Sequence, residues 1–507
     1  MSPDQDTETT TDVIIIGSGF SGMGIAIELR RSGREDFVII EKADDVGGTW
    51  RDNTYPGCAC DIPSHLYSYS YALNPDWTRR FSYQPEIQDY LRRIADEFHL
   101  REKIHFRTEM TSARWDDDDQ VWRISTASGR RYAARVLVSG IGGLHVPNVP
   151  DLPGRDEFEG VAFHSARWRH DVDLTGKRVA VVGTGASAVQ FLPRIAGYAG
   201  HVTVYQRTPP WVLPKLDHPI SERARALYRR APALQRAYRN ALYWMFEARA
   251  AGFNGKPAIL RMAEKVVWRQ IAKQVTDPAL RAKLVPDYRM GCKRIMIASD
   301  YYPTYNRDNV DLVAGGVERI TPTGVVGADG VEREVDVIVY GTGFHVTDVF
   351  EYVDVVGRGD VSLWEQFQKK GIETYLGINV ANFPNFSLLL GPNTALGHNS
   401  VVFMIEQQTK YVVRLLDEMD ARGVRTFEVR EQAQQRFNDA LQAKLENGIW
   451  STGGCTSWYL DSQGRNRTIW PGFTVSYWWR TRTVDPDAYV WGVPRATPPR
   501  REKAAVG

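Results

Sequence analysis

The sequence predicts an α/β protein with two Rossmann-like dinucleotide-binding domains, the second of which carries a helical insertion. Two glycine motifs and the chain length predict this class. DVIIIGSGFSG places Gly17, Gly19 and Gly22 after an apolar β-branched run, and KRVAVVGTGASA repeats the arrangement with Gly183 and Gly185. Each motif opens a helical pattern that leads to a second strand. With 507 residues, the chain also exceeds a single hydrophobic core.

Both motifs fit a nucleotide pyrophosphate for the same physical reason. Glycines let backbone amides approach the phosphates, and a helix N-terminus offers unsatisfied N–H groups and a positive dipole. A single motif is weak evidence because glycine-rich turns precede many helices, but two motifs with matched spacing are not. The expected contacts are Gly17, Gly19, Ser21 and Gly22 in the first motif, and Gly183, Gly185, Ala186 and Ser187 in the second, where Ala188 takes the third glycine slot.

The residue 24 positions beyond the first glycine of each motif distinguishes the two nucleotides. In the first unit it is Glu41, and in the second it is Arg207, which Thr208 follows. A carboxylate at this place accepts hydrogen bonds from a ribose diol, whereas a guanidinium pairs with a ribose 2′-phosphate. The sequence therefore predicts FAD in the first unit and NADPH in the second.

Later strands divide the chain into interleaved domains. A Pro-rich linker follows the first unit near residue 142, and DVIVYGTGF (336–344) is expected to close the second unit. FPNFSLLLGP (383–392) resembles another strand of the first unit. The predicted ranges are 1–142 (FAD domain, first part), 150–217 (NADP domain, first part), 218–290 (helical insertion), 291–375 (NADP domain, second part) and 376–507 (FAD domain, second part, with a disordered tail).

The insertion is helical by pattern and rich in basic residues. Its expected apolar positions are Leu227, Ala231, Leu234, Tyr238 and Leu242, with a bend or break at Pro232. Residues 218–273 contain twelve Lys or Arg and three Asp or Glu. A solvated helical face explains this composition most simply, while weak contact with a membrane surface or steering of anionic NADPH stays open.

Composition excludes several other classes. The net charge of +2 gives no case for a nucleic-acid partner. The four cysteines form no CxxC motif and lack the density of a disulfide scaffold, which fits a reducing compartment. Cys58 and Cys60 have no further ligands at usable spacing, so we expect no metal. With no signal-peptide pattern and no apolar run of spanning length, the expected location is cytoplasmic.

A third motif lies between the two glycine motifs. FEGVAFHSARWR contains Phe158, Gly160, His164 and Trp168 in the pattern FxGxxxHxxxW. This pattern resembles the fingerprint of the Baeyer–Villiger monooxygenases, flavin enzymes that insert oxygen beside a ketone carbonyl. Flavin-containing monooxygenases, which oxidise nitrogen and sulfur, typically carry Tyr or Phe at Trp168. Arg169 departs from the Pro or Asp that usually follows the Trp.

The resemblance covers most of the chain, from Asp12 to about Trp479. GGTW (47–50) and NTYPGCACDIPSHLYSYSY (53–71) are similar to the family's flavin-side segment, MGCKRIMIASDYYPTYNRDNV (290–310) to its NADP-side segment, and SWY (457–459) to its C-terminal loop. The residues that this resemblance assigns are Gly48, Thr49, Trp50, Asp61 and Tyr67 on the FAD side, and Lys293, Arg294 and Trp458 on the NADP side.

The resemblance also implies a reaction. NADPH reduces FAD, oxygen adds to give a C4a-peroxyflavin, and this species converts a ketone into an ester or lactone, with some side oxidation of sulfur. Arg294 would stabilise negative charge on oxygen, and Asp61 would hold it through a bidentate pair. NADP⁺ would stay bound to shield the site, and His164 would respond to NADP(H) without acting as an acid or base.

Rival functions remain at this point. A heteroatom-oxidising flavin monooxygenase shares the cofactors. A disulfide reductase needs a redox-active cysteine pair, but Cys58 and Cys60 are too close in sequence for an unstrained disulfide. A flavoprotein module that docks on membranes through the insertion would show no ketone-stimulated turnover. Loops that include GPNTALGHNS (391–400) and parts of the insertion are expected to line the ketone pocket. The sequence does not reveal the shape of this pocket, so the ketone and the oligomeric state stay open.

Overall fold

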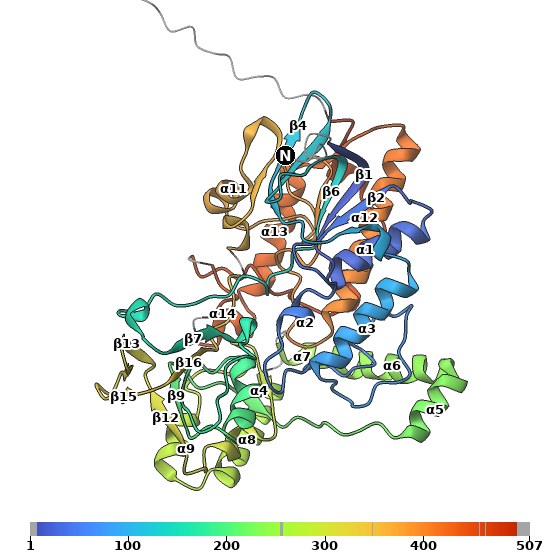
Figure 1. The fold of residues 1–507 in the computed structure, drawn as a ribbon. Coiled ribbons are helices and arrows are strands. Elements are labelled where there is room, and N and C mark those ends of the chain that lie inside the picture. The colour runs from blue at the N-terminus through green and yellow to red at the C-terminus, as the bar shows by residue number, and fades with distance from the viewer. Residues whose placement is uncertain (1–7, 254–256, 347, 456, 462, 494–507) are drawn as a thin grey trace, which may run out of the picture.

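The computed structural model describes residues 8–253, 257–346, 348–455, 457–461 and 463–493. The expectations about the extreme N-terminus (1–7) and about the tail after 493 lie outside these residues. Figure 1 shows two α/β units, with α6 and α5 extending from the second toward one side of the molecule. Within the described part of the chain, no helix combines the length and apolar character needed to span a membrane.

The first unit is built on an eight-stranded sheet with the order β17-β4-β5-β6-β1-β2-β3, in which β18 also pairs with β6. The glycine motif follows β1 (Thr9–Ile16), which lies parallel to β2 (Phe37–Ile40) and to β6 (Arg131–Ser139). Strand β18 (Phe386–Leu388) extends this parallel set, as the FPNFSLLLGP pattern predicts. The other strands are β3 (Ile104–His105), β4 (Met110–Asp116), β5 (Val121–Thr126) and β17 (Asp354–Val356).

Helices cover the first sheet and complete this unit. The glycine motif opens α1 (Phe20–Arg31), which packs on the long C-terminal helix α12 (Val401–Arg422), and both lie beside the sheet in Figure 1. The remaining elements are α2 (Thr49–Asp52), α3 (Gln84–Glu97), α11 (Leu363–Lys370), α13 (Glu431–Leu445), α14 (Ile449–Thr452), α15 (Thr474–Thr481), β19 (Phe427–Val429) and β20 (Tyr489–Trp491).

The second unit has an all-parallel five-stranded sheet with the order β12-β9-β8-β16-β7. Strand β8 (Arg178–Val182) leads through the second glycine motif into α4 (Ala186–Ile195), and β9 (His201–Gln206) follows. The predicted closing strand is confirmed as β16 (Val337–Tyr340). Elsewhere in this unit lie β7 (Val161–His164), α10 (Tyr301–Thr304), β12 (Val310–Ala314), β13 (Val317–Thr321), β14 (Gly324–Gly327) and β15 (Glu332–Glu334).

One domain boundary differs from the sequence-based expectation. Strand β17 lies within the range 291–375 that was assigned to the second unit, but it pairs in parallel with β4 of the first sheet. The chain therefore returns to the first unit between the end of β16 and Asp354, before residue 376. The short pattern DVV carries too little periodicity to reveal this pairing, which depends on a strand far away in sequence.

The insertion is helical, with α5 (Glu222–Arg230), α6 (Pro232–Glu247), α7 (Ala250–Phe253), α8 (Pro257–Gln274) and α9 (Pro278–Leu284) between β10 (Val212–Leu213) and β11 (Met296–Ile297). As expected, the helix breaks at Pro232, which begins α6. The expected apolar stripe is confirmed only in part. Leu242 is buried and Tyr238 packs beside it, but Leu227 and Leu234 are exposed. Helix α6 also buries Gln235 and Arg239, which donate to the backbone carbonyls of Asn74 and Ser68.

Candidate active site

The glycine turns of both units have the geometry that a pyrophosphate requires. Gly17 and Gly183 adopt φ of +90° and +98°, which L side chains rarely adopt. A Cβ on Gly22 would lie 1.8 Å from the carbonyl oxygen of Gly17. Helices α1 and α4 begin after Gly19 and Gly185 without a side-chain cap, so their first amides are left for a ligand. Ser21, Ala186 and Ser187 lie in these first turns.

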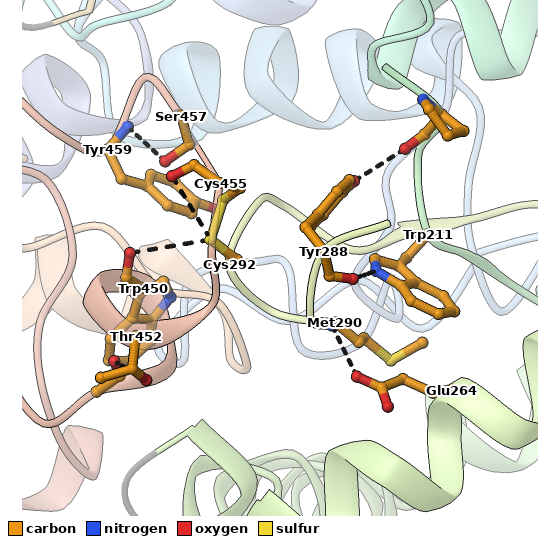
Figure 2. Close-up of a disulfide and its surroundings, with 12 residues drawn as sticks. Trp211, Glu264, Tyr288, Met290, Cys292, Trp450, Thr452, Cys455, Ser457 and Tyr459 are labelled. Atoms are coloured by element: carbon orange, nitrogen blue, oxygen red, sulfur yellow. Dashed lines mark hydrogen bonds between the residues drawn. A yellow bond between two sulfur atoms is a disulfide. The ribbon is translucent and has the colours of Figure 1, made fainter. Parts of the chain in front are cut away.

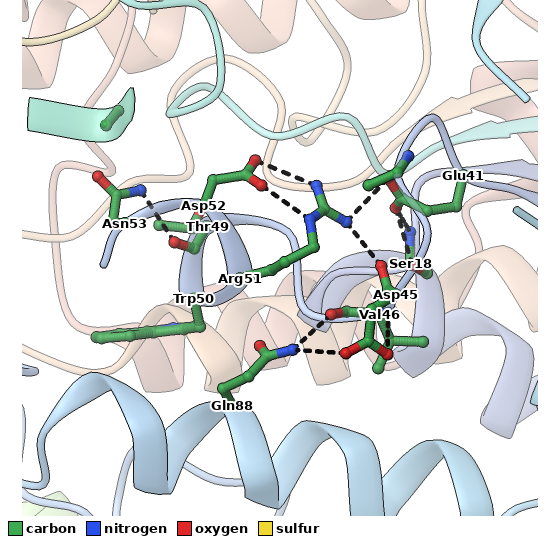
Figure 3. Close-up of polar contacts among 12 residues, drawn as sticks. Ser18, Glu41, Asp45, Val46, Thr49, Trp50, Arg51, Asp52, Asn53 and Gln88 are labelled. Atoms are coloured by element: carbon green, nitrogen blue, oxygen red, sulfur yellow. Dashed lines mark hydrogen bonds and ion pairs between the residues drawn. The ribbon is translucent and has the colours of Figure 1, made fainter. Parts of the chain in front are cut away.

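The first unit holds Glu41 in a closed polar cluster, shown in Figure 3. Glu41 is 4% exposed and accepts hydrogen bonds from the amide and hydroxyl of Ser18 at 2.9 and 2.8 Å. Arg51 pairs with the same carboxylate at 3.0 Å and with Asp52 at 2.8 Å. Burial opposes the charge of Arg51, but these two acids outweigh it and raise the pKa of Arg51. Sequence reasoning missed Arg51, although it directly follows the GGTW motif.

The remaining flavin-side residues form the wall next to this cluster. Gly48 comes so close to Gly19 that a Cβ on it would lie 3.3 Å from the Gly19 Cα. Thr49 begins α2, and Trp50 donates its indole N–H to the hydroxyl of Tyr67 at 3.1 Å. Burial raises the pKa of Tyr67, so this phenol remains a neutral hydrogen-bonding group. The structure thus brings Gly48, Trp50 and Tyr67 to the same side of the first glycine motif.

The second unit presents a different arrangement at the corresponding place. Arg207 is exposed at the end of β9 and pairs with no carboxylate among the described residues. Burial and the charge of Arg207 lower the pKa of Lys293, whose ammonium lies 4.9 Å from the centre of the Tyr288 ring. The carbonyl of Thr208 accepts a hydrogen bond from Thr184, which fixes the strand tip to the glycine loop. Two cations that form no ion pair within the described part of the chain suit a phosphate group, although Asp287 acts on Lys293 from a distance.

Arg294 and Asp61 meet where the two units face each other. A guanidinium nitrogen of Arg294 donates to Oδ2 of Asp61 across 233 residues of sequence. The structure shows one such contact, so the expected bidentate geometry is not found. Side-chain exposures of 37% and 27% leave both groups accessible to a ligand. The charge of Asp61 raises the pKa of Arg294 against the opposing effect of burial, so the guanidinium stays protonated.

The fingerprint motif lies at the edge of the second sheet. A Cβ on Gly160 would lie 2.6 Å from the carbonyl oxygen of Asp336 and close to the Phe158 ring, so this position requires glycine. His164 ends β7, accepts a hydrogen bond from the amide of Ala166, and has a pKa that burial lowers to about 4. Its Nε2 has no partner among the described residues. Trp168 packs on Phe191 of α4 at 5.4 Å between ring centres.

A second link between the units was not foreseen. Gln190 of α4 accepts hydrogen bonds from the Tyr55 hydroxyl at 3.0 Å and from the amide of Ala59 at 3.2 Å. Its own amide donates to the carbonyl of Ala59 at 3.0 Å. A Cβ on Gly57 would lie 2.8 Å from the Gln190 carbonyl oxygen. The flavin-side segment that carries Asp61 is therefore fixed directly to the helix of the second glycine motif.

The cysteines depart from the expectation of a chain without disulfides. Cys58 and Cys60 are free and buried, and burial raises the pKa of Cys58 to about 12. Cys292 and Cys455, which are 163 residues apart, form a disulfide. Counting cysteines could not reveal this pair, because only the fold brings the segment before Lys293 to the loop before Trp458. Trp458 itself is 42% exposed, and its ring lies 4.5 Å from that of Tyr459 at a tilt of 57°.

Comparison with known proteins identifies the family. A family model described as pyridine nucleotide-disulphide oxidoreductase matches residues 14–228. A Baeyer–Villiger monooxygenase from Pseudomonas aeruginosa is 48% identical, with 94% of this chain and 90% of that protein covered. The chain belongs to the Baeyer–Villiger monooxygenases. It is an FAD- and NADPH-dependent monooxygenase, and its free, buried Cys58 and Cys60 do not form the active disulfide of a reductase.

Solved structures agree with this family assignment. Cyclohexanone monooxygenase from Rhodococcus sp. Phi1 bound to NADP⁺ has a TM-score of 0.86 at 28% identity, and the match covers 97% of this chain and 100% of that one. The OTEMO complex with FAD and NADP has a TM-score of 0.85 at 29% identity, with 96% and 100% covered. The expected fold class of this Baeyer–Villiger monooxygenase is thereby confirmed.

Proposed function

We propose that this Baeyer–Villiger monooxygenase oxidises small ketones to esters or lactones at the Arg294–Asp61 pair. The observation that carries the proposal is the pair itself. Its two members come from the flavin-side segment and from the segment that follows the insertion, and the fold joins them across 233 residues. Both keep part of their surface accessible, as a reacting group requires.

The described residues fit both cofactors. The first glycine turn, Glu41 and the wall of Trp50 and Tyr67 would hold FAD, while the second glycine turn, Arg207, Thr208 and Lys293 would hold NADPH. FAD, once reduced by NADPH, supplies the activation of molecular oxygen. Trp458 would cover the nicotinamide nucleotide. Its ring contacts that of Tyr459, which lies close enough to Arg294 to feel the charge of the guanidinium.

Arg294 would act on negative charge that develops on oxygen during transfer to the ketone. A guanidinium remains charged at all working pH values, and the pairing with Asp61 reinforces this. Asp61 would orient the guanidinium and balance part of its charge before the reaction. Preorganised donors of this kind are worth a factor of about 100 to 1,000 in turnover. We expect no proton transfer by His164, because burial lowers its pKa to about 4, which makes it a weak base and leaves no proton to donate at neutral pH.

Oxygen labelling tests the proposal. The purified holoenzyme is supplied with NADPH, ¹⁸O₂ and a panel of linear, cyclic, aromatic and steroidal ketones, with a sulfide and an amine in parallel. We expect NADPH consumption that depends on a ketone, and an ester or lactone that contains one labelled oxygen atom. Products confined to sulfoxides and N-oxides across the panel would favour the heteroatom-oxidising alternative. The ketone that reacts fastest would define the substrate class. Cytoplasmic location stays a prediction, and weak contact of the insertion with membranes stays an open alternative to a solvated helical face.

A further inference from the structure

The Cys292–Cys455 disulfide joins two segments on which the proposed NADP site depends, and Figure 2 shows its surroundings. Cys292 is fully buried and directly precedes Lys293 and Arg294. Cys455 is half-buried and lies three residues before Trp458. The bond is thus positioned to fix the loop of Trp458 relative to the cations that would bind NADP and act on oxygen.

One backbone hydrogen bond and apolar packing accompany this bond. The amide of Arg289 donates to the carbonyl of Gly453 at 3.0 Å, and a Cβ on Gly453 would lie 2.5 Å from the Cβ of Cys292. On its other side, the Trp458 loop is held by the amide of Arg467, which donates to the Tyr459 carbonyl at 3.0 Å. Between these two anchors, Trp458 exposes 42% of its surface. Opening the disulfide would leave the Arg289–Gly453 hydrogen bond and the packing of Gly291 against Ile449 between the two segments.

We propose that Cys292–Cys455 is a reversible thiol–disulfide site, which takes a dithiol as its reductant and sets how firmly the Trp458 loop retains NADP⁺. This rests on the proposed role of Trp458 in covering the nucleotide. The two cysteines differ in burial: Cys455 is partly exposed, whereas Cys292 is fully buried. We therefore expect a dithiol to attack at Cys455.

The exchange is balanced in two steps. One thiolate of the dithiol attacks the Cys455 sulfur, the bond to Cys292 breaks, and Cys292 leaves as a thiolate that takes up a proton. The second thiol of the reagent then displaces Cys455, which also becomes a thiol. The dithiol gives up two electrons and two protons and leaves as a cyclic disulfide. Lys293 and Arg294, which follow Cys292 directly, would favour its departure as an anion.

Three measurements on the holoenzyme test the site. The first counts thiols by alkylation and mass spectrometry of the denatured protein, before and after dithiothreitol. The second titrates NADP⁺ through the change in flavin absorbance. The third measures the hydrogen peroxide released per NADPH consumed. We expect two free thiols before reduction and four after it. Reduction should weaken NADP⁺ binding about three- to tenfold and increase peroxide release, because the loop no longer stays over the nucleotide.

Cys455→Ser provides the matched variant. It should resemble the reduced wild-type enzyme in NADP⁺ affinity and should not change further on addition of dithiothreitol, which excludes effects of the reductant on Cys58 and Cys60. Four free thiols in the air-oxidised enzyme, or equal NADP⁺ affinity and peroxide release in its two redox states, would overturn the proposal. Since NADP⁺ binding is measured without a ketone, a failure to form esters would be a separate result. If Cys455→Ser folds poorly, the comparison of oxidised and reduced wild-type enzyme still tests the proposal.

Discussion

Each nucleotide-binding unit contains a strand, a glycine turn and a helix. The residue at the tip of the second strand, however, differs in both charge and exposure between the two units. In the first unit Glu41 is 4% exposed and is held by Ser18 and Arg51. In the second unit Arg207 is exposed and has no acidic partner among the described residues. A closed cluster suits a nucleotide that stays bound, and an open cation suits one that exchanges. The same local fold thus carries a closed carboxylate in the first unit and an open cation in the second.

The largest effect is expected where the two units meet. Arg294→Ala should retain FAD and fold normally but lose ester formation by a factor of about 1,000 or more, because one guanidinium would serve oxygen at more than one stage. Arg294→Lys should recover little, since an ammonium lacks the planar donors of the guanidinium. The measurement is the rate of ester formation under saturating NADPH. Arg178→Ala, which removes a surface ion pair with Asp336, is the control. Near-normal ester formation by the Ala variant would exclude the proposed role.

A charge reversal in the first unit should remove its cofactor. Glu41→Arg would place a second buried guanidinium beside Arg51, and neither could accept the hydrogen bonds that a ribose diol donates. The purified variant should therefore be colourless, and FAD added back should not restore the flavin spectrum. Glu97→Arg, an exposed position on α3, should remain yellow. Full FAD occupancy in Glu41→Arg would show that the first motif does not read the flavin nucleotide through this residue.

Acid should lower the stability of the fold because each of the two units contains a buried histidine that resists protonation. Burial lowers the pKa of His65 and of His164 to about 4, below the usual 6.5. Between these values the unfolded chain binds more protons, so stability falls as pH drops from 6.5 toward 4, by up to about 3 kcal/mol per histidine. Denaturant titrations should show a shallower acid dependence in His65→Gln and in His164→Gln, but an unchanged one in the exposed His218→Gln. Equal slopes in all three variants would contradict this.

The sequence predicted features that depend on neighbouring residues. Each glycine motif, its helix and the discriminating residue at the next strand tip lie within about thirty residues, so local pattern and elementary geometry suffice. The same holds for the break at Pro232. The pairing of Arg294 with Asp61 spans 233 residues. Resemblance to a family predicted their joint role, but spacing alone could not have done so.

Long-range contacts account for what the sequence did not reveal. Gln190, which ties α4 to Tyr55 and Ala59, is one polar residue on a helix and carries no pattern of its own. The disulfide needs the fold to bring Cys292 to Cys455. Helix α6 buries the polar Gln235 and Arg239 beside the predicted Leu242, because backbone carbonyls of another loop accept their hydrogen bonds. A search for apolar periodicity cannot find polar residues of this kind.

The difference between the two strand tips is tested most directly by equilibrium titration of NADPH and NADH. The measurement compares dissociation constants for the wild type, Arg207→Ala and Arg223→Ala, the last an exposed arginine of the insertion. Loss of one charge-assisted contact should weaken NADPH about ten- to a hundredfold in Arg207→Ala and leave NADH nearly unchanged. Arg223→Ala should bind both as the wild type does. Equal affinity of the wild type for NADPH and NADH, or equal loss of both in Arg207→Ala, would contradict the assignment.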